Sequence, residues 1–439
     1  MLKAFIKYAA QSTLGMLAIS CYILADTFFV SLAMGSDGLA ALNIALPAYA
    51  FINGTGLMLG MGGSIRSTVL RSRGENSSAD AVFTNTVYLA AAFSVLFVLA
   101  GLFFSRPLVT ALGADGAIYP LAEIYLRIML LFAPAFISND VLLCYTRNDG
   151  NPRLAMVAQM SGSAANILLD YVFMFPLGMG LTGGILATVG SPLIGLTLML
   201  VRVVRGKSGF RPVRVPPDIR TIGRHFTLGV PSLVEQFSSG VVMIVFNNII
   251  LAAAGDKGVA AYGVVANVSM IAVYMFAGIA QGTQPLMSRA YGEGRRRDLT
   301  ALLRYALTAA VGLGAVVYAV LLSLAPQVAG IFNSEGDAAM QAMAETGIRL
   351  YFAALPFVAF NVVTCAFFSA RERALPAQAI SVARGLAIIV PMALLLSFVW
   401  GMTGVWLAYP ATEALVAVGT LVLLVRECGR VASAEEKIS

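Results

Sequence analysis

Two residues in the stretch "NILLDYVFM" (166–174) could carry ion chemistry inside an otherwise apolar segment. Asn166 and Asp170 are four residues apart, so in a helix they lie on one face, one turn from each other. An ionised aspartate at the centre of a membrane helix costs about 2.5–3.5 kcal/mol on insertion scales. Such a residue usually pairs with another side chain, faces water or binds an ion, so it marks a candidate functional site.

A second aspartate and a threonine extend this set of oxygen-bearing side chains. Asp26 lies in the first apolar stretch and Thr188 midway along the sixth, and no lysine or arginine lies at membrane depth in this half. Two carboxylates, an amide and a hydroxyl are hard ligands that suit Na⁺, or a proton shared between the acids. We therefore expect Asp26, Asn166, Asp170 and Thr188 to form a coupling site at which a proton and Na⁺ exclude each other. The alternative is that both acids are permanently protonated hydrogen-bonding groups.

Other polar residues at membrane depth are candidates for the lining of a substrate cavity. Tyr22 precedes Asp26 by one helical turn, and the remaining candidates lie in both halves of the chain. The predicted cavity residues are Tyr22, Asn139, Asp140, Glu235 and Asn361.

A structural alternative applies to the second half. Arg384 is charged and lies at membrane depth, so it can pair with Glu235 or with Glu413. The sequence leaves open whether this second-half group is functional or is a structural ion pair.

The composition shows which elements must hold these residues. Of the 439 residues, 59% are hydrophobic and only 12% are charged, with a mean hydropathy of +0.84. A soluble protein of this size keeps about 25% of its residues charged. The apolar residues fall in blocks of about 20 to 25 residues, the length at which a helix crosses a bilayer. These features predict an all-α polytopic membrane protein with twelve spans. The predicted spans are 8–34, 39–65, 82–104, 121–146, 154–176, 181–204, 226–254, 259–287, 301–325, 346–370, 374–399 and 402–425.

Charge distribution predicts the orientation of the spans. The predicted loops and helix ends on one side, together with both termini, hold 24 of the 29 lysines and arginines, and the opposite side holds four. The positive-inside rule therefore predicts cytoplasmic termini and a cell membrane location. The net charge of +7 is then a topology signal with affinity for lipid, and we expect no nucleic acid partner.

The chain repeats itself. "GSDGLAA" (35–41) recurs as "GDKGVAA" (255–261), and "GLTGGILA" (180–187) recurs as "GMTGVWLA" (401–408). The nearly constant offset predicts two six-helix bundles related by pseudo-two-fold symmetry along the membrane normal, as in alternating-access transporters. We expect an N-lobe at 1–204, a basic linker at 205–224, and a C-lobe with a short tail at 225–439.

Several segments resemble one transporter family. These are "ILADTFFVSLAMGSDGLAALNIALP", "LGMGGSIRSTVLRSRGE", "NILLDYVFMFPLGMGLTGGILAT", "GVPSLVEQ" and "GIAQGTQPLMSRAYGEG". The chain is similar along nearly its whole length to MATE multidrug and toxin extrusion transporters, and most similar to their DinF-like branch. That branch uses a span-1 Asp, a span-5 Asn-x-x-x-Asp pair and a span-6 Thr as its cation site, which matches the residues above.

Two departures from the family pattern concern particular spans. The NorM branch relies on a span-7 Glu and a span-10 Asp, whereas this chain has Glu235 but only Asn361 and Thr364 in span 10. The first span has Gln11 where the second half has Pro231, so a proline-driven bend is not expected there, and Gly15 is a weak substitute.

The resemblance implies a secondary antiporter that exports amphipathic organic cations in exchange for Na⁺ or H⁺. We expect a monomer without a cofactor, in which Na⁺ binds only as the transported ion. The alternative from the same superfamily is a lipid-linked oligosaccharide flippase, which the acidic cavity and the number of spans disfavour. An intramembrane aspartyl protease would need Tyr-Asp and Gly-x-Gly-Asp motifs that this sequence lacks, and no P-loop for ATP is present. We therefore expect a transporter and not an enzyme.

Overall fold

The computed structural model describes residues 1–114, 116, 118–333 and 336–436, with side chains up to residue 427. Within these residues the chain is helical and contains no strand. The last three residues of the predicted C-terminal tail, 437–439, lie outside this range. The first half contains α1 (Leu2–Ser72), α2 (Asn76–Phe103), α3 (Ser105–Ala111), α4 (Ile118–Leu131), α5 (Ala133–Asn148), α6 (Pro152–Met174) and α7 (Gly180–Val204). The second half contains α8 (Ile219–Gly292), α9 (Arg296–Ser323), α10 (Ala325–Phe332), α11 (Ala338–Tyr351), η1 (Phe352–Ala354), α12 (Leu355–Ala370), α13 (Ala374–Val382), η2 (Ala383–Ala387) and α14 (Ile389–Glu436).

Three of the long helices contain a break at a glycine where one span ends and the next begins. The backbone leaves helical geometry at Gly35 in α1 (φ 60°), Gly255 in α8 (φ 64°) and Gly401 in α14 (φ 55°). Only glycine adopts such a positive φ without a steric cost from Cβ. Gly35 and Gly255 begin the two copies of the repeated motif, so the internal repeat appears in the backbone as well as in the sequence.

The count of spans follows from these breaks. In the described residues, seven uninterrupted or nearly uninterrupted helical segments are long and apolar enough to cross a membrane, and α4 with α5, bent by 49°, forms an eighth. Dividing α1, α8 and α14 at their glycines adds three passes, and α6 completes the predicted twelve. Two short helices outside the predicted spans, α3 and α10, were missed because they are too short to span.

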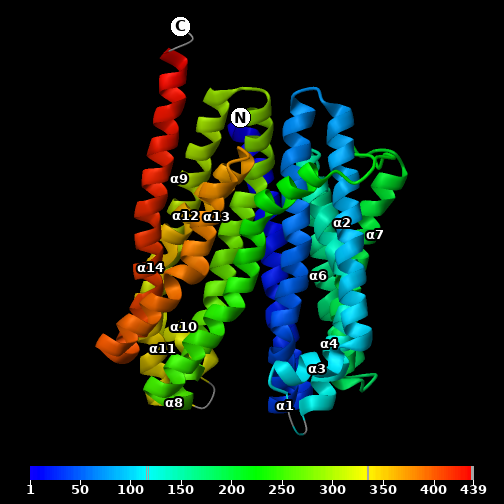
Figure 1. The fold of residues 1–439 in the computed structure, drawn as a ribbon. Helices are drawn as coiled ribbons and strands as arrows, with labels where there is room; N and C mark the ends of the chain where they lie inside the picture. The colour runs from blue at the N-terminus through cyan, green and yellow to red at the C-terminus, as the bar shows by residue number, and fades with distance from the viewer. Residues whose placement is uncertain (115, 117, 334–335, 437–439) are drawn as a thin grey trace.

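The helices form two bundles that lie side by side (Figure 1). The N-lobe consists of α1 to α7 and the C-lobe of α8 to α14. Both chain termini and the linker between the lobes lie at the same end of the bundles, at the top of Figure 1. We call this the terminal end. The predicted architecture of two six-span bundles is confirmed.

The first span runs without a proline-induced bend. The proline inside α1 is Pro47, which lies in its second span, and the break in α1 is at Gly35. Gly15 serves a different purpose, because a Cβ there would lie 2.4 Å from Oε1 of Gln159 on α6. The glycine therefore permits close packing of the first span against α6.

The two lobes touch closely through glycines toward the terminal end. A Cβ on Gly278 would lie 2.4 Å from Cα of Thr13, and one on Gly282 would lie 2.6 Å from the carbonyl oxygen of Tyr8. Small residues four positions apart allow close helix packing in membranes, and here they join α8 of the C-lobe to α1 of the N-lobe.

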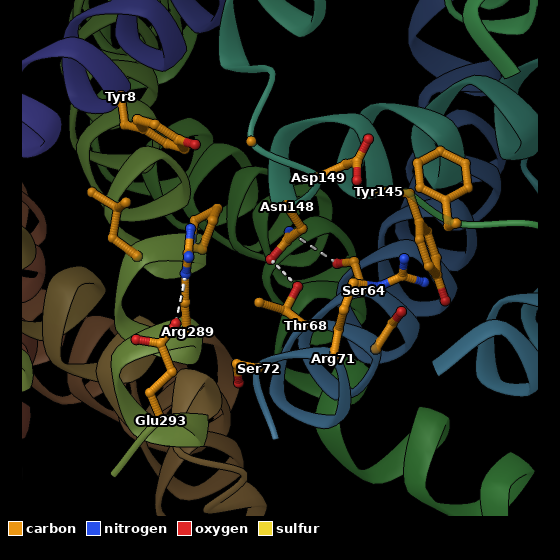
Figure 2. Close-up of a pocket in the computed structure, with 15 residues that line it drawn as sticks. Tyr8, Ser64, Thr68, Arg71, Ser72, Tyr145, Asn148, Asp149, Arg289 and Glu293 are labelled. Atoms are coloured by element: carbon orange, nitrogen blue, oxygen red, sulfur yellow. Dashed lines mark hydrogen bonds and ion pairs between the residues drawn. The ribbon is translucent and has the colours of Figure 1, made fainter. Parts of the chain in front are cut away.

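Polar side chains reinforce the same seam. Among the described residues, contacts that cross between the lobes include Arg66 with Glu372 at 2.8 Å, Arg147 with Gln281 at 2.5 Å, and Thr86 with the ring Nε2 of His225 at 2.7 Å. A cavity of about 380 Å³ lies beside them, with walls from both lobes (Figure 2). In Figure 2, Asn148 joins Thr68 and Ser64 by hydrogen bonds, while Arg289 pairs with Glu293. The lobes are thus closed toward the terminal end by charged and polar contacts.

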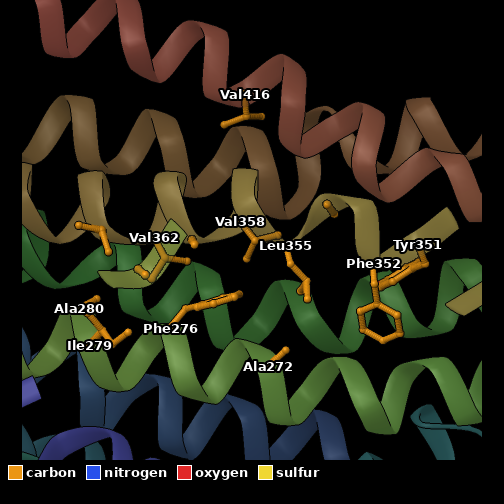
Figure 3. Packing of buried hydrophobic residues seen from close by; sticks show 14 of the residues in the cluster. Ala272, Phe276, Ile279, Ala280, Tyr351, Phe352, Leu355, Val358, Val362 and Val416 are labelled. Atoms are coloured by element: carbon orange, nitrogen blue, oxygen red, sulfur yellow. The ribbon is translucent and has the colours of Figure 1, made fainter. Parts of the chain in front are cut away.

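Each lobe has its own apolar core. In the C-lobe, Phe276 and Ala272 of α8 pack with Leu355 and Val358 of α12 (Figure 3). The N-lobe cluster is built mainly from α1 to α7. Because lipid tails are as apolar as these side chains, close packing rather than escape from water holds such helices together. The two cores are largely separate. They meet near the terminal end, where Phe5 and Ala9 of α1 join the C-lobe cluster and Leu228 of α8 packs with Met61 and Ile65 of α1.

Candidate coupling and substrate site between the lobes

The structure brings the four predicted coupling residues together from three helices of the N-lobe. Asp26 comes from α1, Asn166 and Asp170 from one face of α6, and Thr188 from α7. All four side chains are buried, and Asn166 and Asp170 are fully so. The carboxyl groups of Asp26 and Asp170 lie close enough to interact electrostatically. The site is therefore a carboxyl pair and not a single acid.

An amide and a hydroxyl fix this carboxyl pair. The Asn166 amide, oriented to satisfy both of its ends, donates to Oδ2 of Asp170 at 3.2 Å and accepts from the backbone N–H of Thr188 at 3.2 Å. The Thr188 hydroxyl donates to the carbonyl of Gly184 at 3.0 Å, and the Tyr125 hydroxyl of α4 lies near Thr188. Asn166 therefore links the two helices that carry Asp170 and Thr188.

The carboxyl pair has no basic partner. None of the ion pairs in the described part of the chain involves Asp26 or Asp170, and one oxygen of each, Oδ1, is buried without a hydrogen bond. Two ionised carboxylates that lie close together repel each other strongly unless a proton or a cation lies between them. No cluster of three or more His, Cys, Asp or Glu side chains exists in the described residues, so a multi-acid metal site of the divalent kind is not formed there. Two acids with neutral oxygen ligands fit a monovalent cation or a proton.

Tyrosines connect this pair to the space between the lobes. The hydroxyls of Tyr22 and Tyr49 lie 2.8 Å apart, and both are within electrostatic reach of Asp26. Tyr274 of α8 faces the same group from the C-lobe, near Tyr49, Glu235 and Asp140. Tyr49 and Tyr274 were not predicted from the sequence, because a tyrosine in an apolar span is most often an ordinary packing residue and its type alone gives no signal.

Asn139 and Asp140 lie on α5, against helices of the N-lobe. Their side chains interact electrostatically, and Oδ2 of Asp140 is buried without a hydrogen-bond partner. A Cβ on Gly56 would lie 2.8 Å from this oxygen, and one on Gly60 would lie 3.0 Å from the Asp140 carbonyl. Gly56 and Gly60 thus make room for α5 and its acid.

The charged residues of the C-lobe form a separate group. Arg384 binds Glu413 through Nη2 at 3.0 Å and approaches Glu235 only to 3.8 Å. Asn361 is fully buried and donates from Nδ2 to Oε2 of Glu413 at 2.7 Å. Asn361, predicted as a cavity residue, therefore supports the ion pair here and does not line an open space. Glu235 is the exposed member, with 46% of its side chain accessible.

Comparison with known proteins agrees with this architecture. The MatE family model matches residues 12–172 and 231–409, one segment in each lobe. The multidrug export protein MepA of Staphylococcus aureus (strain N315) is 23% identical over 428 residues, which cover 96% of this chain and 93% of that protein.

Solved structures match along the whole length. An outward-facing multidrug resistance MATE family transporter of the MOP superfamily superposes with a TM-score of 0.92 at 25% identity, covering 100% of this chain and 97% of that one. A MOP superfamily transporter from Pyrococcus furiosus, described as having a binding pocket of reverse polarity, gives a TM-score of 0.89 at 25% identity, with coverage of 96% and 94%.

Proposed function

Because the chain belongs to the MatE family, a family of multi-pass membrane transporters, we propose that it exports amphipathic organic cations in exchange for Na⁺ or H⁺. Its relatives are drug efflux transporters and not enzymes, which disfavours both the protease and the flippase alternatives. The substrate is a small molecule. The chemistry of the cavity supports a cation, and Asp26 with Asp170 supports coupling through the N-lobe.

The observation that carries this proposal is the carboxyl pair without a basic partner. Buried acids normally gain a counter-charge or lose their own charge. Asp26 and Asp170 have no counter-charge among the described residues, so a proton or Na⁺ from solution must supply it. Because the two occupants neutralise the same oxygens, each displaces the other, and the coupling ion changes the charge that faces a cationic substrate.

Alternating access follows from the two largely separate cores and the polar seam. If the terminal end is cytoplasmic, as the distribution of lysine and arginine predicts, this conformation is closed toward the cytoplasm. An ion entering from outside would neutralise the N-lobe pair and release the substrate. Loss of that negative charge would then allow the seam at Arg66–Glu372 and Arg147–Gln281 to open.

The cavity residues suit an aromatic cation. Tyr22, Tyr49 and Tyr274 present π faces and hydroxyls, and Glu235 supplies a carboxylate from the C-lobe. We further propose that the protein acts as a monomer in the cell membrane with both termini in the cytoplasm. It contacts lipid along its apolar surface and requires neither a cofactor nor nucleic acid. The assignment to the DinF-like branch stays a prediction from Asp26, Asn166, Asp170 and Thr188.

The proposal is tested by uptake of ethidium into everted membrane vesicles with an imposed Na⁺ or H⁺ gradient. We expect Asp26→Asn and Asp170→Asn each to abolish gradient-driven uptake, because an amide cannot exchange a proton or balance a cation. Glu345→Gln, a change in an exposed pair with Arg349, is the matched control and should transport normally. Full gradient-driven activity in both aspartate variants would refute coupling through the N-lobe. Loss of activity in Glu235→Gln alone would transfer that role to the C-lobe.

A further inference from the structure

Arg384 lies in an irregular turn that places its side chain between two acids. The helix from α13 to α14 contains the π-helical turn η2 (Ala383–Ala387), closed by a hydrogen bond from the N–H of Ile388 to the carbonyl of Ala383 at 3.0 Å. Such wide turns in helices are frequently found at functional sites. The turn is therefore a reason to ask whether Arg384 does more than hold two helices together.

The packing of α8 against this turn sets the position of Glu235. A Cβ on Gly385 would lie 2.4 Å from Oγ of Ser238, so α8 and the turn are in close contact there. Glu235 precedes Ser238 by three residues and lies on the same side of α8. The glycine thus brings the carboxylate of Glu235 beside the guanidinium of Arg384.

The two acids hold Arg384 very unequally. Glu413 is 1% exposed, accepts from both Nε and Nη2 of Arg384, and also accepts from Asn361. Glu235 is 46% exposed and contacts only Nη1, at 3.8 Å, with no hydrogen bond to any described residue. A contact at that distance without a hydrogen bond is weak, whereas a buried pair with several hydrogen bonds is costly to break. Arg384 therefore forms its main ion pair with Glu413 and only a weak contact with Glu235.

Glu235 also faces the tyrosines between the lobes. The hydroxyl of Tyr274 lies within electrostatic reach of Glu235, and Tyr274 is in turn near Tyr49 of the N-lobe. An exposed carboxylate with a weak partner, next to aromatic rings, has the chemistry that recognises an aromatic cation. On this basis, which rests on the proposed function, we propose that Arg384 is an internal substitute for the cationic group of the substrate. It occupies Glu235 in the empty transporter and yields it to a bound cation.

This arrangement makes Arg384 a residue that sets affinity. Arg384 partly neutralises the negative charge of Glu235, so a cation must compete with the guanidinium for this carboxylate. A weakly charged or poorly fitting molecule therefore gains little binding free energy at Glu235. When the cation binds, Arg384 remains satisfied by Glu413, so no buried charge is left without a partner. The C-lobe group would thus act in substrate selection, independently of ion coupling in the N-lobe.

Equilibrium binding of ethidium to the purified protein, without any gradient, tests this role. We expect Glu235→Gln to raise the Kd about tenfold, and Glu235→Asp to recover most of that loss. The double variant Arg384→Gln/Glu413→Gln removes one positive and one negative charge, so the net charge of the group does not change. It frees Glu235, and we expect the Kd to fall about fivefold. Adding Glu235→Gln to that double variant should bring the Kd back to the value of the single variant.

Several results would overturn the inference. An unchanged or higher Kd in the folded double variant would show that Arg384 does not restrain Glu235. An unchanged Kd in Glu235→Gln would remove Glu235 from substrate recognition and would overturn the inference even if the double variant failed to fold. Ethidium that binds neither to the wild type nor to any variant would count against the cationic substrate itself. If Asp170→Asn lost coupled uptake but bound ethidium normally, the defect would lie in ion coupling in the N-lobe, and the inference about Arg384 and Glu235 would stand.

Discussion

The two lobes share a scaffold but place their charges at different positions and balance them in opposite ways. The N-lobe buries two acids without a basic partner, whereas the C-lobe buries an acid with an arginine and exposes a second acid. The two copies of the repeat are 220 to 222 residues apart. At these offsets Asp26 corresponds to Phe246, and Asp170 corresponds to Met392.

The C-lobe charges also lack charged counterparts: small residues occupy the corresponding positions of the N-lobe. Glu235 and Arg384 correspond to Gly15 and Gly162, and both glycines are points of close helix contact. A charge that needs a partner from solution suits ion exchange, while a charge already balanced within the protein suits selection or structure. The following predictions test this difference, beginning with the largest expected effect.

The first prediction concerns stability. Arg384→Gln should lower the free energy of unfolding by about 3 kcal/mol, because Glu413 would be left as a buried charge without its main partner. Asp170→Asn should leave stability nearly unchanged, since its removal orphans no charge. Thermal unfolding in detergent measures both. Restoration of stability by adding Glu413→Gln to Arg384→Gln would confirm the cause, and a large loss in Asp170→Asn would mean that the N-lobe pair is structural.

The second prediction compares two asparagines at equivalent positions of the repeat. Asn361→Leu should cost about 2 kcal/mol, because a hydrogen bond to the charged Glu413 is lost in a fully buried place. Asn139→Leu should cost less, since Asn139 is partly exposed and its neighbour Asp140 is not part of an ion pair. Equal losses, measured by the same unfolding experiment, would show that both asparagines serve the scaffold and that the lobes differ less than proposed.

Sequence reasoning located the acids but not the way in which each is balanced. The identity and helical spacing of Asn166 and Asp170 fixed their common face, and burial in an apolar span required that they find partners. Arg384 was predicted to pair with Glu235 or with Glu413. In the structure, Arg384 lies closer to Glu413 than to Glu235. A π-helical turn and the contact between Gly385 and Ser238 set these distances, and no local sequence pattern encodes them.

The same limit explains the residues that were missed. Tyr49 and Tyr274 become site residues only because two distant segments of the chain meet between the lobes. The short helices α3 and α10 lack the length on which prediction of membrane spans depends. In contrast, the repeated motif that begins at Gly35 and Gly255 is visible in the sequence, because the positive φ at these positions favours glycine.

The third prediction concerns ion linkage. If Na⁺ is the coupling ion, Na⁺ at ten times its Kd should stabilise the wild type by about 1.4 kcal/mol, because the ion binds only the folded protein. The shift in unfolding temperature should disappear in Asp170→Asn and persist in Glu235→Gln. If H⁺ is the coupling ion, Na⁺ should have no effect on either. A Na⁺ shift lost in Glu235→Gln but kept in Asp170→Asn would reverse the roles of the two lobes.

The fourth prediction concerns Tyr274, which stands between the acids of both lobes. Tyr274→Phe keeps the aromatic ring but removes the hydroxyl that lies near Glu235 and Asp140. Loss of one polar contact should raise the Kd of ethidium about threefold, which is less than the effect of removing the Glu235 carboxylate. Tyr125→Phe, which removes a hydroxyl near Thr188 inside the N-lobe, is the matched control and should leave ethidium binding unchanged. If Tyr125→Phe weakened binding more than Tyr274→Phe, the cation would contact the N-lobe pair directly, and coupling and recognition would share one site.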